Sequence, residues 1–148
     1  MDFKNMTPEV ALQGFGSGFD CSTCTLAHVA DKIGLDEETA LKISGAFGGG
    51  MWRGDTCGAV VGALMAIGMK YAQTEAGDEE TKNNMFAKKA EFEKRFSEKY
   101  GSLICREILG YDLSTEEGMA AIMEQELLAK KCPYVVCDAC EILEEILG

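Results

Sequence analysis

The stretch CGAVVGALMAIGM, from Cys57 to Met69, is the longest apolar run of the chain and decides how we interpret its fold. Its 13 residues fall short of the roughly 18 that a membrane-spanning helix needs, so we expect a buried core helix. Small residues recur along it at spacings of three and four and therefore share one helix face: Gly58, Ala59, Gly62, Ala63 and Ala66. Such a face lets a neighbouring backbone approach closely. The sequence leaves open whether that neighbour belongs to the same chain or to a second copy in a homodimer.

Helical periodicity continues through most of the chain, and no stretch shows the alternating pattern of a strand. We therefore predict an all-α fold, a compact single-domain bundle over residues 1–148 with about six to eight helices, several of them short. The predicted helices begin at Thr7-Pro8, after Asp20, at Asp36, near Asp55 or Thr56, after Ser102, after Ser114 or Thr115, and after Cys132-Pro133. The Asp36 helix is expected to carry an apolar stripe as far as Phe47. Residues 73–84 predict a turn, followed by an amphipathic helix with Phe92, Phe96 and Tyr100 on one side.

Composition and charge indicate which partners and which cellular compartment to expect. With 47% hydrophobic residues the chain can form a core without disulfides. The 25 acidic and 14 basic residues give a net charge of −11, which repels phosphate backbones and anionic lipids, so we expect neither nucleic acid nor membrane as a partner. The first residues lack the basic and apolar regions of a signal peptide, so we expect a reducing cytoplasm.

Seven cysteines carry the strongest functional signal, and their odd number forbids complete pairing within the chain. Four of them fall at the cap or in the first turn of a predicted helix: Cys21, Cys57, Cys105 and Cys132. Free N–H groups and the helix dipole stabilise an anion there, so we expect lowered thiol pKa values and redox-reactive or metal-binding sulfurs. The alternative for any one of them is packing, because cysteine behaves as a small apolar residue.

Five segments around these cysteines resemble the C-GCAxxG-C-C family, whose members are described as redox-active. They are Phe19-Asp20-Cys21, Gly48-Gly49-Gly50-Met51 with Arg53-Gly54, Cys57-Gly58-Ala59-x-x-Gly62-Ala63, Cys105-Arg106-Glu107-Ile108-Leu109-Gly110, and Cys132-Pro133. The resemblance runs from about Phe15 to Leu147 and implies a redox function, with the four family cysteines at positions 21, 57, 105 and 132. A domain related to this family occurs in split-Soret cytochromes, in which an iron–sulfur cluster accompanies haem. The family name places Gly before Cys, whereas this chain has Cys57 before Gly58.

The three remaining cysteines complete two C-x-x-C pairs. Cys24 follows Cys21, and Cys140 follows Cys137, so each pair shares one helix face and could bind one metal or close a disulfide. Cys140 continues an apolar stripe and could be core, whereas Cys137 shares its face with Glu141 and Glu144. These three cysteines, with the single histidine His28 four residues after Cys24, are secondary metal-ligand candidates. The alternative for His28 is a buried side chain without a chemical role. Neither pair precedes a histidine, which disfavours c-type haem attachment.

The glycine-rich loop of residues 48–54 leads into the predicted Cys57 helix. Consecutive glycines allow left-handed backbone and close approach, so this loop could shape a small cavity over the sulfurs. We take Gly49, Gly50, Arg53 and Gly58 as candidate cofactor-contacting residues. Arg53 would favour a thiolate or an anionic substrate, and its alternative is an ordinary surface arginine beside carboxylates.

Three functions remain open at this stage. The leading hypothesis is a redox and electron-transfer protein whose converging cysteines Cys21, Cys57, Cys105 and Cys132 bind an iron–sulfur cluster. The second is a cofactor-free thiol–disulfide protein, in which one sulfur attacks and another resolves the mixed disulfide. The third is a structural zinc or other metal-binding protein. The sequence identifies no redox partner and does not decide whether the protein is an enzyme.

Overall fold

The computed structural model describes all 148 residues and contains nine α-helices and no strand, which confirms the all-α prediction. The helices are α1 (Pro8–Gly16), α2 (Cys21–Val29), α3 (Glu37–Ile43), α4 (Gly58–Tyr71), α5 (Glu79–Tyr100), α6 (Cys105–Leu109), α7 (Glu116–Glu124), α8 (Leu127–Lys130) and α9 (Cys132–Leu147). A 3₁₀ turn spans Ala30–Ile33 and a π-type turn spans Gly50–Gly54.

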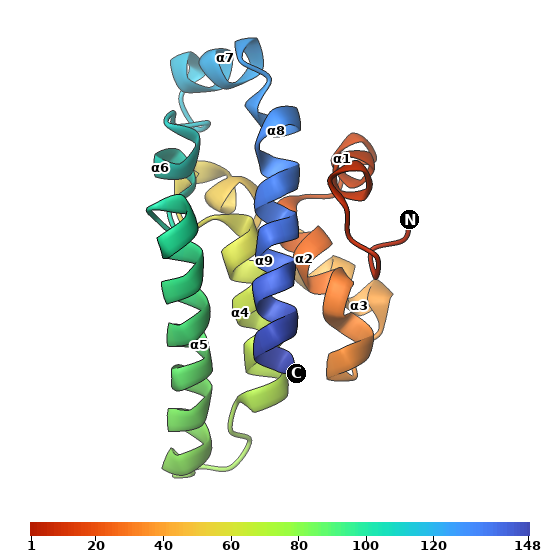
Figure 1. Ribbon diagram of the computed structural model, residues 1–148, viewed down its shortest axis with the longest axis vertical. Coiled ribbons are helices and arrows are strands. Elements are labelled where there is room, and N and C mark those ends of the chain that lie inside the picture. Colours follow the sequence, from red (N-terminus) through yellow and green to blue (C-terminus); the bar gives the residue numbers. More distant parts are fainter.

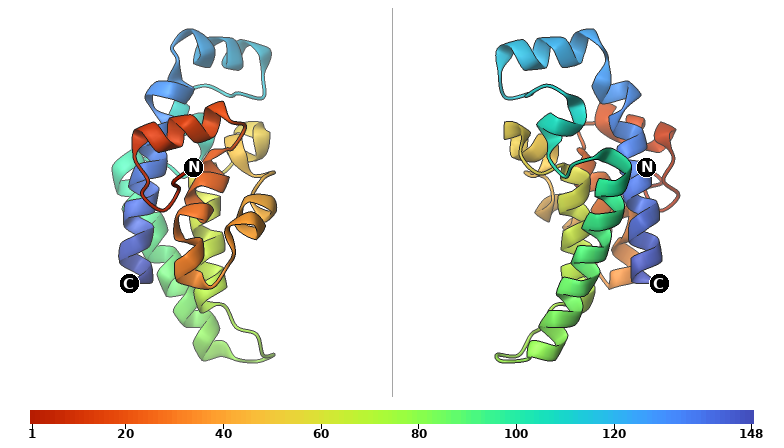
Figure 2. Two further views of the ribbon diagram at one scale, coloured as in Figure 1. Left: turned by 90° about the vertical axis from the view of Figure 1, so that its right-hand side faces the viewer. Right: turned by 60° about the vertical axis from the view of Figure 1, so that its left-hand side comes forward.

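Three long helices, α4, α5 and α9, run side by side along the molecule, and α1 to α3 lie along one flank of them (Figure 1). The short helices α6, α7 and α8 gather at one end. At the opposite end the connection between α4 and α5 reaches past the other helices (Figure 2). None of the helices combines the length and the apolarity that a membrane span requires.

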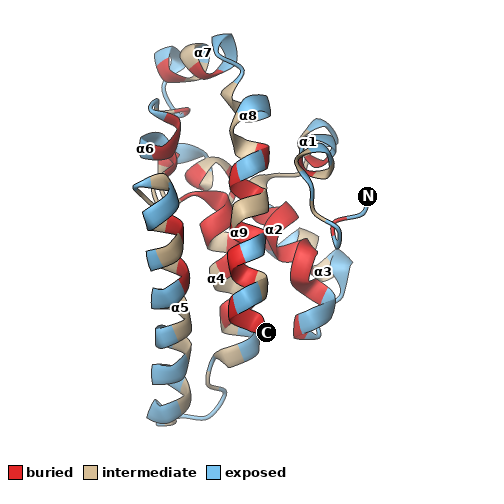
Figure 3. Cartoon of the chain, in the orientation of Figure 1, coloured by how far each residue is buried: buried red, intermediate tan, exposed pale blue.

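The main core surrounds α4, as the distribution of buried residues shows (Figure 3). It extends from Phe3 to Leu147, so both ends of the chain contribute to it. The exposed helix α5 turns Phe92 and Phe96 into this core, and both side chains are fully buried, as the sequence predicts. A second, smaller core lies at the α6–α7 end: Cys105, Leu109, Leu113 and Ile122.

The glycine-alanine face of α4 packs against α2 within the chain. A Cβ atom placed on Gly62 would lie 2.6 Å from the carbonyl oxygen of Ser22, so the two backbones meet where no side chain fits between them. The polar side chains of α2 that this packing buries are hydrogen-bonded: Ser22 donates to the Ser44 carbonyl at 2.8 Å and Thr25 to the Cys21 carbonyl at 2.8 Å. The tight crossing predicted from the sequence is therefore intramolecular, and this face is covered by α2.

Several predicted helix boundaries are wrong. Helix α5 begins at Glu79, so the predicted turn over residues 73–84 is too long; the Asp78 carboxylate caps the helix by accepting from the Thr81 N–H at 3.2 Å. Helix α3 ends at Ile43 and does not reach Phe47. Helix α8 was not expected at all, because its four residues are too few to show a period.

Substituting Gly62 tests the α2–α4 crossing. We expect Gly62→Ala to lower the free energy of unfolding by about 1–3 kcal/mol, the usual cost of overpacking, because the new methyl group would collide with the Ser22 carbonyl. Gly68→Ala is the matched control, since it lies in the same helix with no neighbouring atom within 4 Å and should be neutral or stabilise by up to about 1 kcal/mol. Urea unfolding of both variants measures the difference, and equal stabilities would contradict the close crossing.

Candidate functional site

Four cysteines line one cavity of about 160 Å³: Cys21, Cys57, Cys105 and Cys132. Each stands at the beginning of a helix, so the cavity lies where the first turns of α2, α4, α6 and α9 converge. The rest of its lining is mostly apolar, and Asp20 is the one charged residue in it. The structure thus brings together the four cysteines that the sequence singles out.

Backbone hydrogen bonds hold two of these helix starts together. The Cys57 N–H donates to the Leu103 carbonyl at 2.8 Å, and the Cys105 N–H donates to the Asp55 carbonyl at 2.6 Å. The two segments form a short antiparallel bridge between Thr56 and Ile104. This bridge places Cys57 and Cys105 on adjacent sides of the cavity although they are far apart in sequence.

Cys21 is the sulfur best prepared to be an anion. The thiol of Cys57 donates a hydrogen bond to it, and the backbone N–H groups of Gly49 and Ser22 donate two more. These donors outweigh burial and the nearby Asp20 carboxylate and lower the pKa of Cys21 to about 7. Gly58 makes the arrangement possible, because a Cβ on it would lie 2.3 Å from the Cys21 Sγ.

The other three cysteines do not follow the sequence-based prediction that helix starts lower their pKa values. The hydrogen bond to Cys21 and burial raise the pKa of Cys57 well above its ordinary value. Burial raises the pKa of Cys105 and of Cys132 to about 12, and a charge on Cys21 opposes their ionisation further. Desolvation outweighs the helix dipole here, and α6 contributes only five aligned peptide units at Cys105.

A left-handed turn forms one wall of the cavity. Gly49 and Gly50 have φ values of 59° and 63°, and the next two residues, Met51 and Trp52, have 60° and 54°. Left-handed backbone is costly in residues other than glycine, so this turn is a strained segment beside the sulfurs. It lays the Trp52 ring against Gly49. Trp52 lines the cavity and remains 47% exposed. Trp52 is not among the site residues predicted from the sequence, although a lone tryptophan in a glycine loop is a usable signal.

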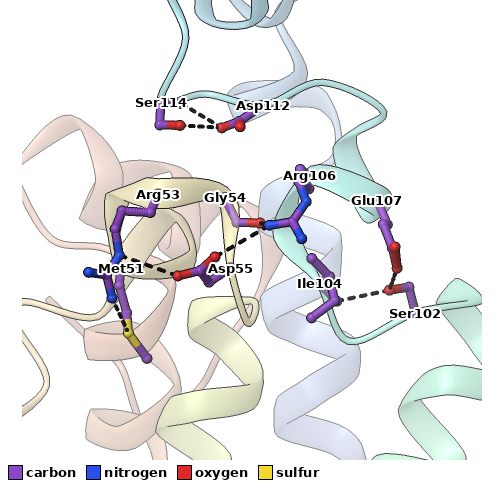
Figure 4. Close-up of polar contacts among 10 residues, drawn as sticks. All are labelled: Met51, Arg53, Gly54, Asp55, Ser102, Ile104, Arg106, Glu107, Asp112 and Ser114. Atoms are coloured by element: carbon purple, nitrogen blue, oxygen red, sulfur yellow. Dashed lines mark hydrogen bonds and ion pairs between the residues drawn. The ribbon is translucent and has the colours of Figure 1, made fainter.

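Arg53 and Gly50 lie outside the cavity lining. The Arg53 guanidinium is exposed and pairs with the Asp55 carboxylate at 3.3 Å, and it also contacts the Met51 sulfur (Figure 4). Arg106 binds the Gly54 carbonyl at 3.1 Å and the same Asp55 at 3.3 Å. In this arrangement Arg53 is therefore a surface arginine beside a carboxylate. Gly50 shapes the turn, since a Cβ on it would meet the Asp55 backbone at 2.4 Å.

The secondary ligand candidates also lie elsewhere. The ring nitrogens of His28 face the Phe3 carbonyl at 2.7 Å and the Glu144 carboxylate at 2.9 Å, so neither is free to bind a metal. Cys24, Cys137 and Cys140 are not part of the cavity lining. Nowhere are three His, Cys, Asp or Glu side chains gathered closely enough to hold a metal ion without rearrangement.

The cysteine pattern matches that of a known protein family. The family described as "Putative redox-active protein (C-GCAxxG-C-C)" matches residues 19–146. The chain belongs to this family. No curated protein and no solved structure shows a match. The chain has Cys57-Gly58 where the family name has Gly-Cys, and the structure explains this order. A side chain does not fit at position 58, because the Cys21 sulfur fills that space. Cys57 contacts the same sulfur from the helix cap.

Replacing Cys57 tests the origin of the low Cys21 pKa. In Cys57→Ala the strongest hydrogen-bond donor to the Cys21 sulfur is lost, so its pKa should rise from about 7 to at least the ordinary thiol value of about 8.5. The rate of Cys21 alkylation by iodoacetamide against pH, followed by peptide mass spectrometry, measures this shift. Cys105→Ala is the control, because it removes a cavity thiol but no donor to Cys21. An unchanged profile in Cys57→Ala would contradict the assignment.

Alkaline stability provides a second test. A thiol whose pKa is raised on folding stabilises the folded protein fully below its unfolded pKa of about 8.5. Above that pH its contribution to the free energy of unfolding falls by up to about 1.4 kcal/mol per pH unit. Cys24, Cys105, Cys132 and Cys140 all belong to this class. Cys21 has the opposite sign and adds stability as pH rises from about 7 to about 8.5.

We therefore expect the melting temperature of the reduced protein to hold or rise slightly up to about pH 8.5 and to fall steeply above it. Thermal unfolding with reductant at a series of pH values measures this. Cys24→Ala should fall less steeply than the wild type, because one buried thiol no longer contributes. Parallel slopes for the two proteins would show that the thiols do not cause the loss.

Proposed function

We propose that this protein is a thiol–disulfide redox protein in which Cys21 and Cys57 cycle between a dithiol and a disulfide. The observation that carries the proposal is that Cys21 and Cys57 line the same cavity, where the Cys57 thiol lowers the pKa of Cys21 and itself stays protonated, so that a nucleophile lies beside a protonated partner. Membership of a family described as redox-active supports it. A reducing cytoplasm, the compartment expected from the sequence, would return Cys21 and Cys57 to the dithiol state.

The reaction follows from the two protonation states. The Cys21 thiolate attacks one sulfur of a partner disulfide, the partner S–S bond breaks, and its first thiolate leaves. That thiolate takes the proton of Cys57. The Cys57 thiolate then attacks Cys21, closes the Cys21–Cys57 disulfide and releases the second partner thiolate. The protein loses two electrons and the partner disulfide gains them; the reverse sequence reduces the protein again.

The cavity walls favour an uncharged partner group. Besides the sulfurs, the cavity is lined by apolar side chains, among them Phe15, Phe19 and Leu128, and no cation takes part. Burial raises the pKa of its one carboxyl, Asp20. An anionic substrate would lose its hydration on entering the cavity and find no positive charge to compensate. We therefore propose that an apolar segment of a partner protein, or a small apolar molecule, enters beside the exposed Trp52.

An iron–sulfur cluster is the second candidate. It is favoured by the four cysteines around one cavity, since four thiolates are the usual ligand set of such clusters. Cys21, Cys57, Cys105 and Cys132 would hold it, with Gly49 and Gly58 beside it, and it would supply one-electron transfer. The donor set fits, but the side chains would first have to draw together. A zinc site would use the same four sulfurs.

Anaerobic purification separates these functions. We expect colourless protein without stoichiometric iron, acid-labile sulfide or zinc, which on oxidation forms the Cys21–Cys57 disulfide. Cys21→Ser and Cys57→Ser should abolish that disulfide, whereas Cys105→Ser and Cys132→Ser should retain it. Stoichiometric iron and sulfide with a bleachable brown colour would establish the cluster in its place, and stoichiometric zinc would establish the metal site.

A further inference from the structure

Three cysteines that the proposed function does not use lie together where α1, α2 and α9 pack against one another. Cys24 on α2 is fully buried, Cys140 on α9 is 2% exposed, and Cys137, one turn earlier on α9, is half-buried. None of them lines the cavity of the other four. The chain therefore has a second group of thiols, with one member that solvent reaches.

Contacts from all three helices define this group. The Cys24 Sγ lies directly over Gly14 of α1, where a Cβ would be 2.9 Å away. Cys140 is hydrogen-bonded to the Thr25 hydroxyl, so its side chain faces α2 next to Cys24. Burial and the neighbouring Asp138 raise the pKa of Cys137, and Glu9 of α1 adds to the shift. The contact of His28 with Glu144 at 2.9 Å, one turn further along α2 and α9, places Cys24 and Cys140 beside each other, with Cys137 one turn before Cys140.

Electrostatics within the group agree with this proximity. Burial is the main cause that raises the pKa of Cys24 and of Cys140. A charge on Cys137 adds to the shift of both, in Cys24 after the larger effects of Cys21 and Asp20, and a charge on Cys24 adds to the shift of Cys140. No third ligand is close enough to make a metal site here. Burial keeps these thiols protonated, so a disulfide between two of them forms only when an oxidant removes the electrons.

We propose that Cys24, Cys137 and Cys140 form a second thiol–disulfide site, in which Cys137 reacts first with an oxidised small-molecule disulfide and Cys24 closes a disulfide that ties α9 to α2. The Cys137 thiolate attacks the disulfide and expels one thiolate, which takes the Cys24 proton. The Cys24 thiolate then attacks the Cys137 sulfur and expels the second thiolate, which takes up the proton that Cys137 gave to solvent when it ionised. The protein thus loses two protons and two electrons, and the small disulfide becomes two thiols.

Geometry selects Cys24 as the resolving sulfur. Cys137 and Cys140 stand three residues apart in the middle of α9, where Cβ atoms are about 5–6 Å apart, and a disulfide needs about 3.5–4.5 Å. Closing that pair would distort the helix. A link between α2 and α9 joins residues of two packed helices and does not distort either helix internally.

The test uses the full chain with all four cavity cysteines changed to serine: Cys21→Ser, Cys57→Ser, Cys105→Ser and Cys132→Ser. One equivalent of 4,4′-dithiodipyridine should release two equivalents of thiopyridone and leave the protein two hydrogen atoms lighter, without an adduct. Because Cys24 is then the only thiol between Lys4 and Lys32, a tryptic peptide joined to residues 132–148 identifies the link. Adding Cys140→Ser should preserve this result, and adding Cys137→Ser should abolish it.

A stable adduct on Cys137 with only one equivalent released would overturn the proposal, and so would a Cys137–Cys140 link. If the multiple variant fails to fold, the same oxidation of the wild-type protein, with fragmentation of the linked peptides, decides the question. A Cys21–Cys57 disulfide formed there without a Cys24–Cys137 link would refute the second site and leave the proposed function intact. The converse result would refute the proposed function alone.

Discussion

The close crossing of α2 and α4 is the constraint on which the rest of the structure depends. Gly62 admits the Ser22 carbonyl, and Gly58, one turn earlier on the same face of α4, leaves space for the Cys21 sulfur. A side chain at the first position would push the two helices apart, and one at the second would displace the sulfur. The apolar run that forms the core therefore also sets how near Cys21 comes to Cys57, so packing and thiol chemistry cannot be varied independently.

The cavity supports one thiolate at a time. Burial penalises every sulfur in it, and only Cys21 collects enough donors to offset that penalty. Once Cys21 is charged, its field adds to the burial that keeps Cys105 and Cys132 protonated. The order of ionisation thus depends on hydrogen bonds and not on helix position. A bound cation would reverse this logic, because positive charge at the centre stabilises several thiolates together.

Features that repeat along a helix could be predicted from the sequence, and features that depend on distant partners could not. The α4 face, the inward Phe92 and Phe96, and the cysteines at helix starts all follow from spacing, and the structure has them. The pKa pattern does not follow, because it depends on Cys57 meeting Cys21 and on burial. His28 is a similar case, since its carboxylate partner Glu144 lies 116 residues away. Left-handed Met51 and Trp52 have no local sequence rule at all.

The two thiol groups share α2, and this shared helix limits where the structure can move during oxidation. Cys21 and Cys24 stand one turn apart, yet one belongs to the cavity and the other to the junction with α1 and α9. Helix α2 is held by the Gly62 contact and by the Ser22–Ser44 hydrogen bond, so shifting it would disturb the core. The segment before α4 is different: residues 49–57 lack regular α-helix and contain the strained turn. Bringing Cys57 to bonding distance of Cys21 can relieve strain in this turn, but it also moves the backbone that the Cys57–Leu103 and Cys105–Asp55 hydrogen bonds hold in place.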